Sequence, residues 1–289
     1  MIPLRNGHVL EYVAASGALA FDGRGWPWEW PLRWLGLLDP RCFTIVTKSL
    51  TRRPRVGNLR WWQPWRCVRL LPHGTVNAIG LTNPGIEWWC RTIGPRVAKF
   101  PYRLIGSIYP ESPGECADMV AMLQPFGLVA IEVNLSCPNT STHGSAAVPQ
   151  AVEMLTAARS ATPWPLIAKL SVTHDYCAIA RASEGLIDAM AINSVPWSVS
   201  FPDRPSPLAT LGGGGVSGQA AQLHTWPMVE KLAAASHTPV IGPSVWEYAD
   251  IAQLRARGAS AISFGSIFLR YPWRPTAFVR CDQRDRIPG

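Results

Sequence analysis

One short stretch of the sequence combines a cysteine with two asparagines at the end of an apolar run. Residues 128–133 are mostly apolar, and the turn after them reads Asn134-Leu135-Ser136-Cys137-Pro138-Asn139. Asparagine amides form neutral hydrogen bonds that orient a polar ligand, and a cysteine thiolate can act as a base or a nucleophile. The alternative is that Cys137 is a small apolar residue in an ordinary turn, which is the usual role of a free cysteine.

Two lysines accompany other strand-like segments. Lys48 directly follows the segment Phe43–Thr47, and Lys169 lies inside the apolar run Trp164–Leu170. A lysine at a strand end can stabilise negative charge on a ligand, although most such lysines are simply solvated. A lysine within an apolar strand needs a partner, because lysine is almost never fully buried alone. We therefore interpret Lys169 as a functional group that points into a barrel.

Small residues and asparagines mark the ends of further strand-like segments. Ala15-Ser16-Gly17 follows the first apolar segment, Asn77 lies in a strand-to-loop unit that begins at Thr75, and Asn193-Ser194 follows residues 187–192. The glycine-rich run at residues 212–218 precedes a helix that we predict at 219–235. Backbone N–H groups of such a loop can hold a phosphate, although the same glycines can also form a linker.

The elements that position these groups alternate between strands and helices. Eight strand-like segments alternate with helices, which is typical of an α/β protein with a (β/α)8 TIM barrel, and the length of 289 residues suits a single domain over 1–289. Except for Lys169, every polar group named above falls at the carboxyl end of a strand, where such barrels carry their active sites. This clustering favours a chemical role for Cys137. The charged tail at 280–286 is predicted to fray.

Composition narrows the classes of function. The net charge of +8 suits an anionic ligand or a phosphate, and no nucleic-acid-binding motif accompanies the arginines between 52 and 60. Seven cysteines without CxxC spacing indicate a reduced interior and no metal site. The sequence lacks an apolar run long enough for a membrane helix and lacks a secretory signal, so we expect a cytoplasmic protein with no membrane partner.

A tryptophan-rich segment stands apart from these patterns. Trp26, Trp28, Trp30 and Trp34 lie close together near the start of the chain, with prolines between them. The segment could form a lid, a surface for a partner or part of the core, and core packing is the interpretation that we favour.

In the order of its motifs, the chain resembles the dihydroorotate dehydrogenase family of flavin-dependent barrels. The resemblance extends over about residues 14–268, and residues 134–139 are its most specific part. Supporting matches are Ala15-Ser16-Gly17, Thr47-Lys48-Ser49, Asn77 with Gly80-Leu81, Lys169, Asn193-Ser194, Gly214-Gly215-Val216-Ser217-Gly218 and Gly265-Ser266.

The resemblance implies that FMN is the cofactor. It places Lys169 near the pyrimidine end of the flavin, where the ammonium would offset the negative charge of the reduced ring. The implied cofactor-binding residues are Ala15, Ser16, Gly17, Lys48, Ser49, Asn134, Lys169, Asn193, Gly215, Gly218, Ser244, Gly265 and Ser266. Of these, Gly215, Gly218, Gly265 and Ser266 would meet the phosphate.

The resemblance also implies oxidation of dihydroorotate to orotate in pyrimidine biosynthesis. Cys137 would remove a proton from the carbon next to the substrate carbonyl while a hydride passes to flavin N5, and Lys48 and Lys169 would complete the catalytic set. The implied substrate-binding residues are Lys48, Asn77, Ile79, Gly80, Leu81, Asn134, Asn139, Asn193 and Ser194. A cation with several amides suits a planar, uracil-like anion.

The identity of the catalytic base indicates which branch of the family the chain resembles. Cys137 in place of a serine, without an N-terminal membrane-associated segment, is similar to the soluble, cysteine-type class 1 branch. That branch implies either fumarate as the electron acceptor of a homodimer, or NAD reached through a separate iron–sulfur flavoprotein subunit. We expect a homodimer and leave the acceptor open.

The sequence departs from the family pattern after residues 238–242. Where the family has two glycines for the phosphate, this chain has Pro243-Ser244. Proline lacks an N–H, and serine is less free than glycine to adopt a positive φ, so we expect the loss of one phosphate contact. The C-terminal helix of the family is short or absent. Two alternatives stay open: a flavin oxidoreductase for another dihydropyrimidine or enone, and a non-catalytic barrel that binds a ligand or a protein.

Overall fold

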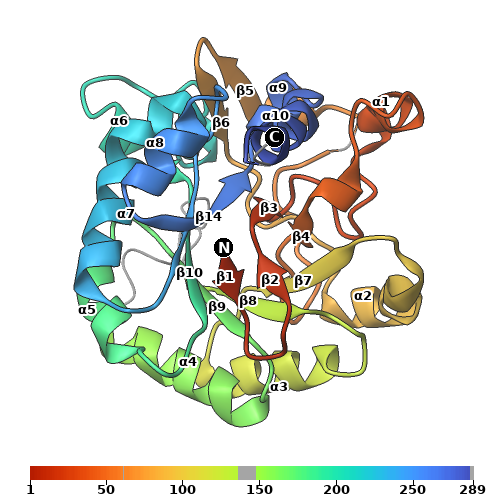
Figure 1. Ribbon diagram of the computed structural model, residues 1–289, viewed down its shortest axis with the longest axis vertical. Coiled ribbons are helices and arrows are strands. Elements are labelled where there is room, and N and C mark those ends of the chain that lie inside the picture. The colour runs from red at the N-terminus through yellow and green to blue at the C-terminus, as the bar shows by residue number, and fades with distance from the viewer. Residues whose placement is uncertain (61, 136–147, 287–289) are drawn as a thin grey trace.

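Eight parallel strands form a closed barrel in the computed structural model, which describes residues 1–60, 62–135 and 148–286 (Figure 1). The strand order around the barrel is β3, β4, β7, β8, β9, β10, β13, β14 and back to β3. The predicted (β/α)8 fold is therefore confirmed. The barrel strands are β3 (Tyr12–Ala14), β4 (Thr44–Val46), β7 (Arg103–Ile108), β8 (Ala130–Asn134), β9 (Leu166–Leu170), β10 (Ala189–Ile192), β13 (Val240–Gly242) and β14 (Ala259–Phe264).

Helices surround the barrel on its outside (Figure 1). The described helices are α1 (Trp30–Trp34), α2 (Ile86–Thr92), α3 (Pro113–Leu123), α4 (Val148–Ala161), α5 (Tyr176–Ala182), α6 (Trp197–Ser200), α7 (Gln222–Ala235), α8 (Asp250–Ala256), α9 (Ile267–Arg270) and α10 (Arg274–Asp285). Helix α3 begins where Ser112 accepts a hydrogen bond from Glu115 N at 3.2 Å, which is a normal N-cap. Within the described ranges, none of these helices is long and apolar enough to span a bilayer.

The alternation of side chains along the strands creates two apolar cores. Tyr12 and Ala14 of β3 belong to the outer core between strands and helices, whereas Val13 belongs to the core inside the barrel. The N-terminal hairpin, β1 (Ile2–Pro3) with β2 (Val9–Leu10), adds Ile2, Leu4 and Leu10 to the inner core. This apolar inner layer leaves the polar residues of the strands to the opposite, carboxyl-terminal side.

A second sheet has four antiparallel strands, in the order β11 (Val195–Pro196), β12 (Gly215–Ser217), β6 (Gly74–Asn77) and β5 (Val68–Leu71). The unit that begins at Thr75 is therefore not part of the barrel. Gly215 pairs with Asn77, so part of the glycine-rich run is a strand rather than a simple loop before a helix. Gly214 has φ +85°, and a Cβ there would lie 2.6 Å from Asn77 O, so this position requires glycine.

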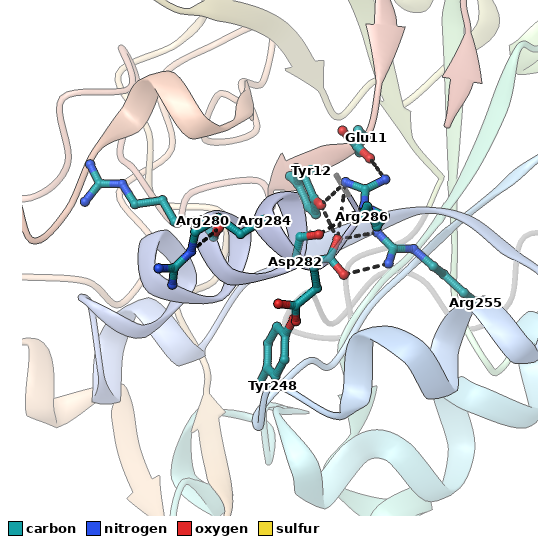
Figure 2. A network of polar contacts seen from close by, with 9 residues as sticks. Glu11, Tyr12, Tyr248, Arg255, Arg280, Asp282, Arg284 and Arg286 are labelled. Atoms are coloured by element: carbon teal, nitrogen blue, oxygen red, sulfur yellow. Dashed lines mark hydrogen bonds and ion pairs between the residues drawn. The ribbon is translucent and has the colours of Figure 1, made fainter. Parts of the chain in front are cut away.

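The C-terminal tail is helical, and the expectation that residues 280–286 fray is wrong. Asp282 in α10 accepts two hydrogen bonds from Arg255 of α8, at 2.8 and 2.7 Å, and one from the hydroxyl of Tyr12 in β3 (Figure 2). Arg286 forms an ion pair with Glu11 at 2.5 Å. These contacts tie the end of the chain to the barrel, which charge counting along the tail does not reveal.

Core packing is also the wrong interpretation for most of the tryptophan-rich segment. Trp28, Trp30 and Trp34 have exposed fractions of 44%, 43% and 80%. The buried residue of the segment is instead Glu29, which begins the turn into α1 and accepts a hydrogen bond from Trp26 N at 2.7 Å.

Candidate active site

A cavity of about 520 Å³ opens at the carboxyl ends of the barrel strands. Its wall gathers residues that follow five barrel strands, residues within β8 and β9, and residues of the four-stranded sheet. The residues of the predicted site that line it are Ala15, Ser16, Gly17, Lys48, Ser49, Asn77, Ile79, Leu81, Asn134, Lys169, Asn193, Ser194, Gly218, Ser244, Gly265 and Ser266. Residues spread over most of the sequence thus meet at one place because their strands are parallel.

Two described residues of the predicted site are not on this wall. Gly215 is buried in β12, where its carbonyl accepts a hydrogen bond from Asn77 Nδ2 at 3.5 Å. Gly80 has φ +68° and does not line the cavity. Cys137 and Asn139 lie outside the described residues.

Lys48, Asn134 and Lys169 line the cavity with exposed fractions of only 8%, 4% and 9%. We call the part of the wall around Asn134 and Lys169 the cationic end. Asn134 and Lys169 are register partners on β8 and β9, so their side chains project from the same face of the sheet. Buried cations with amide donors and acceptors can bind a planar anion that carries carbonyl groups.

A buried carboxylate lies beneath this end, and the sequence analysis did not single it out. Glu132, which is 3% exposed, accepts a hydrogen bond from Ser107 Oγ at 2.9 Å and pairs with Lys169 Nζ at 3.4 Å. Glu132 precedes Asn134 by two residues in a strand, which puts both side chains on one face. The sequence feature that could have identified Glu132 is an acidic residue inside an otherwise apolar strand.

Another part of the wall is a loop that follows β13. Ser244 has φ +68°, a left-handed backbone conformation that serine adopts less readily than glycine. Gln222 Nε2 donates to Ser244 O at 3.0 Å, and the hydroxyl of Thr225 lies 3.1 Å from that of Ser244. Two side chains of α7 therefore hold the strained residue in place.

The rim of the cavity is aromatic and comes from the tryptophan-rich segment. The Trp26 and Trp28 rings are stacked, with centroids 5.4 Å apart and an angle of 4° between their planes. Trp26 Nε1 donates to Gly17 O at 3.0 Å, which fixes the pair beside the small residues after β3. Trp65, Leu70 and Leu269 line the same cavity.

The chemistry of the wall fits a flavin nucleotide. A volume of about 520 Å³ is in the range of cofactor pockets, and the wall combines apolar surface with a few convergent polar groups. The cationic end suits the pyrimidine ring of a flavin, and the small residues Gly17 and Gly265 leave room for a flat ring. Among residues 1–60, 62–135 and 148–286, no cluster of three or more side chains could hold a metal ion.

Known proteins resemble this chain over most of its length. A family model described as Dihydroorotate dehydrogenase matches residues 35–274. The "Dihydroorotate dehydrogenase B (NAD(+)), catalytic subunit" of Desulforudis audaxviator (strain MP104C) is 35% identical over 270 residues, which is 90% of this chain and 83% of the relative. The protein with the same name from Bacteroides thetaiotaomicron is 31% identical over 230 residues, which is 77% of this chain and 74% of that relative.

A solved structure agrees with the fold. The crystal structure of a phosphonomutase-like protein from Burkholderia cenocepacia J2315 superposes with a TM-score of 0.51 and 17% sequence identity, covering 95% of this chain and 93% of that one. At this identity the match supports the barrel architecture alone.

Proposed function

The chain belongs to the dihydroorotate dehydrogenase family, and from this we propose that it oxidises dihydroorotate to orotate with FMN as its cofactor. The observation that carries the proposal is the convergence of Lys48, Asn77, Asn134, Lys169 and Asn193 on one cavity, in a chain 35% identical to a named catalytic subunit. The reaction would make this protein an oxidoreductase of pyrimidine biosynthesis.

FMN, when bound, supplies the hydride acceptor. Lys169 and Asn134 would hold the pyrimidine end of the ring, while Ala15, Ser16 and Gly17 would lie against it. The phosphate would lie among Gly218, Ser244, Gly265 and Ser266, which line the cavity after β12, β13 and β14. Gly215 would act indirectly, since its carbonyl accepts from Asn77.

The substrate would bind beside the cationic end. Lys48 is 8% exposed and would meet the substrate carboxylate, which fits because a buried ammonium favours an anionic partner. Asn77, Asn193 and Ser194 would orient the ring carbonyl and N–H groups. We assign to Cys137 the removal of the proton from the carbon next to the carbonyl, and to Asn139 a further contact with the ring.

The names of the relatives bear on the electron acceptor. Each of the two relatives above is called a catalytic subunit of an NAD(+) enzyme, which supports a separate electron-transfer subunit as the partner of this chain. We propose that electrons reach NAD through that partner, with fumarate as the alternative acceptor. A homodimer and a cytoplasmic location complete the proposal.

A turnover assay with an artificial dye tests the proposed reaction. The purified chain, loaded with FMN, is expected to reduce the dye in the presence of dihydroorotate and to release an equal amount of orotate. Lys48→Met should raise the KM for dihydroorotate at least about tenfold, since the carboxylate loses its cation. Reduction of the dye by another dihydropyrimidine, with none by dihydroorotate, would assign a different substrate.

A further inference from the structure

The proposed reaction leaves the carboxylate of Glu132 without a role. Glu132 lies inside the barrel with 3% of its surface exposed, and its neighbours on the flanking strands are Ser107 of β7 and Lys169 of β9. Burial of a carboxylate and an ammonium is costly even when they are paired, and apolar residues often do as well for stability. A buried pair whose ammonium lines the cavity is therefore better explained by the site than by stability.

Glu132 is also connected through hydroxyl groups to Ser49 and Ser16, which line the cavity. Ser107 Oγ donates to Glu132 at 2.9 Å and lies 2.8 Å from Ser49 Oγ, which is 3.0 Å from Ser16 Oγ. A carboxylate only accepts hydrogen bonds, so the proton of Ser107 points to Glu132 and Ser49 must be the donor to Ser107. The charge of Glu132 thereby sets the orientation of the Ser49 hydroxyl on the cavity wall.

We propose that Glu132 is a positioning residue that holds Lys169 and, through Ser107, Ser49 against the cofactor, and that its charge lowers the reduction potential of the bound flavin. This inference rests on the proposed function, because it assumes that FMN occupies the cavity. Lys169 alone would favour the reduced ring, which carries more negative charge than the oxidised ring. The carboxylate behind Lys169 offsets part of that attraction, because opposite charges at close range partly cancel at a third site.

The direction of the change in the flavin reduction potential distinguishes the role of Glu132 from that of Lys169. Glu132→Gln keeps an oxygen that accepts from Ser107 and removes only the negative charge, so the reduced flavin should bind more tightly relative to the oxidised flavin. Lys169→Met removes the positive charge and should act in the opposite direction. A change of about tenfold in the ratio of the two affinities equals a shift of about 30 mV in a two-electron potential.

The experiment is an anaerobic redox titration of the FMN-loaded protein against a reference dye, with FMN dissociation constants measured in parallel. In Glu132→Gln we expect a reduction potential at least about 30 mV more positive than that of the wild type, which corresponds to a tenfold change in the ratio of the affinities for reduced and oxidised flavin. In Lys169→Met we expect a potential more negative than that of the wild type. Ser107→Ala keeps both charges but removes a donor that partly neutralises the carboxylate, so a smaller negative shift is expected. Glu153→Gln removes an exposed carboxylate on α4 and should leave the potential unchanged.

The outcomes separate this inference from the proposed function. If flavin-loaded Glu132→Gln has the wild-type potential, the inference is wrong while the proposed function stands. If Glu132→Gln does not fold, an unchanged potential in Ser107→Ala overturns the inference in the same way. A wild-type chain that binds no flavin overturns the proposed function and this inference with it.

Discussion

Ser244 adopts a left-handed backbone conformation that is unusual for a residue other than glycine. Its φ of +68° would suit glycine, and the hydroxyl of Thr225, at 3.1 Å, partners the serine hydroxyl. We predict that Ser244→Ala lowers the free energy of unfolding by about 1 kcal/mol, because the strain persists while the hydrogen bond is lost. Ser244→Gly should lie within about 0.5 kcal/mol of the wild type, since relief of strain offsets the lost bond.

Urea unfolding of the two variants at neutral pH measures the difference. Equal loss of stability in Ser244→Ala and Ser244→Gly would show that the left-handed backbone is not strained. FMN dissociation constants of the same proteins would show how far the hydroxyl contributes to cofactor binding.

The proposed role of Cys137 as a base can be tested by substitution alone, although Cys137 lies outside the described residues. In Cys137→Ala, bound FMN should remain, and its reduction by dihydroorotate should slow by about 10²- to 10⁴-fold, which is the usual contribution of a general base. Cys137→Ser should retain more activity than the alanine variant, because serine can also accept the proton. Stopped-flow absorbance under anaerobic conditions gives the rates, and a wild-type rate in the alanine variant would exclude the assigned role.

The turn before α1 couples a buried acid to the rim of the cavity. Burial raises the pKa of Glu29 to about 7, although the Trp26 N–H and the charge of Arg33 favour the ionised form. Between pH 4.5 and about 7 the folded protein holds a proton that the unfolded chain has released. The free energy of unfolding should therefore fall as pH rises through this range, by about 3 kcal/mol at most.

Glu29→Gln tests this dependence because the amide keeps an oxygen for Trp26 N but does not titrate. Urea unfolding at pH 4.5 and pH 8 should show a smaller loss of stability in Glu29→Gln than in the wild type. Glu153→Gln, on the exposed face of α4, is the matched control and should follow the wild type. Identical pH profiles for Glu29→Gln and the wild type would contradict the account.

Asp282 is one of several residues that attach helix α10 to the barrel (Figure 2). Burial opposes the ionisation of Asp282, but hydrogen bonds from Arg255 and Tyr12 outweigh it and lower the pKa of Asp282. Asp282→Asn should lower the free energy of unfolding by about 2 kcal/mol, since hydrogen bonds to a charged group are lost. Amide hydrogen exchange should increase first in residues 274–285. Asp203→Asn, at an exposed site, is the control, and equal stability of the two variants would refute this role.

At the scale of the whole molecule, the barrel was predictable and its additions were not. The apolar run Trp164–Leu170 contains β9 (Leu166–Leu170), and the helix predicted at 219–235 corresponds to α7 (Gln222–Ala235). One apolar cluster includes residues from Tyr12 to Val279, which supports our proposal that residues 1–289 form a single domain.

The remaining features depend on contacts between distant parts of the chain. The place of β6 in a separate sheet is set by its pairing with β12, and nothing local in Gly74–Asn77 indicates that partner. The order of α10 depends on Arg255 and Tyr12, which are far away in sequence. Asn134 and Asn193 on the cavity wall were predicted from their places at strand ends and from the family resemblance. Trp65 and Leu70 on the same wall were not predicted, because neither belongs to a strand-end motif.

The measurement that tests the central claim most directly is an anaerobic absorbance spectrum of the purified protein before and after addition of dihydroorotate. The account predicts a flavin spectrum that bleaches on addition, which would establish the cofactor, the substrate and the first half of the reaction together. A flavin spectrum that remains oxidised would contradict dihydroorotate as the substrate. The absence of flavin binding, even with added FMN, would contradict the account as a whole.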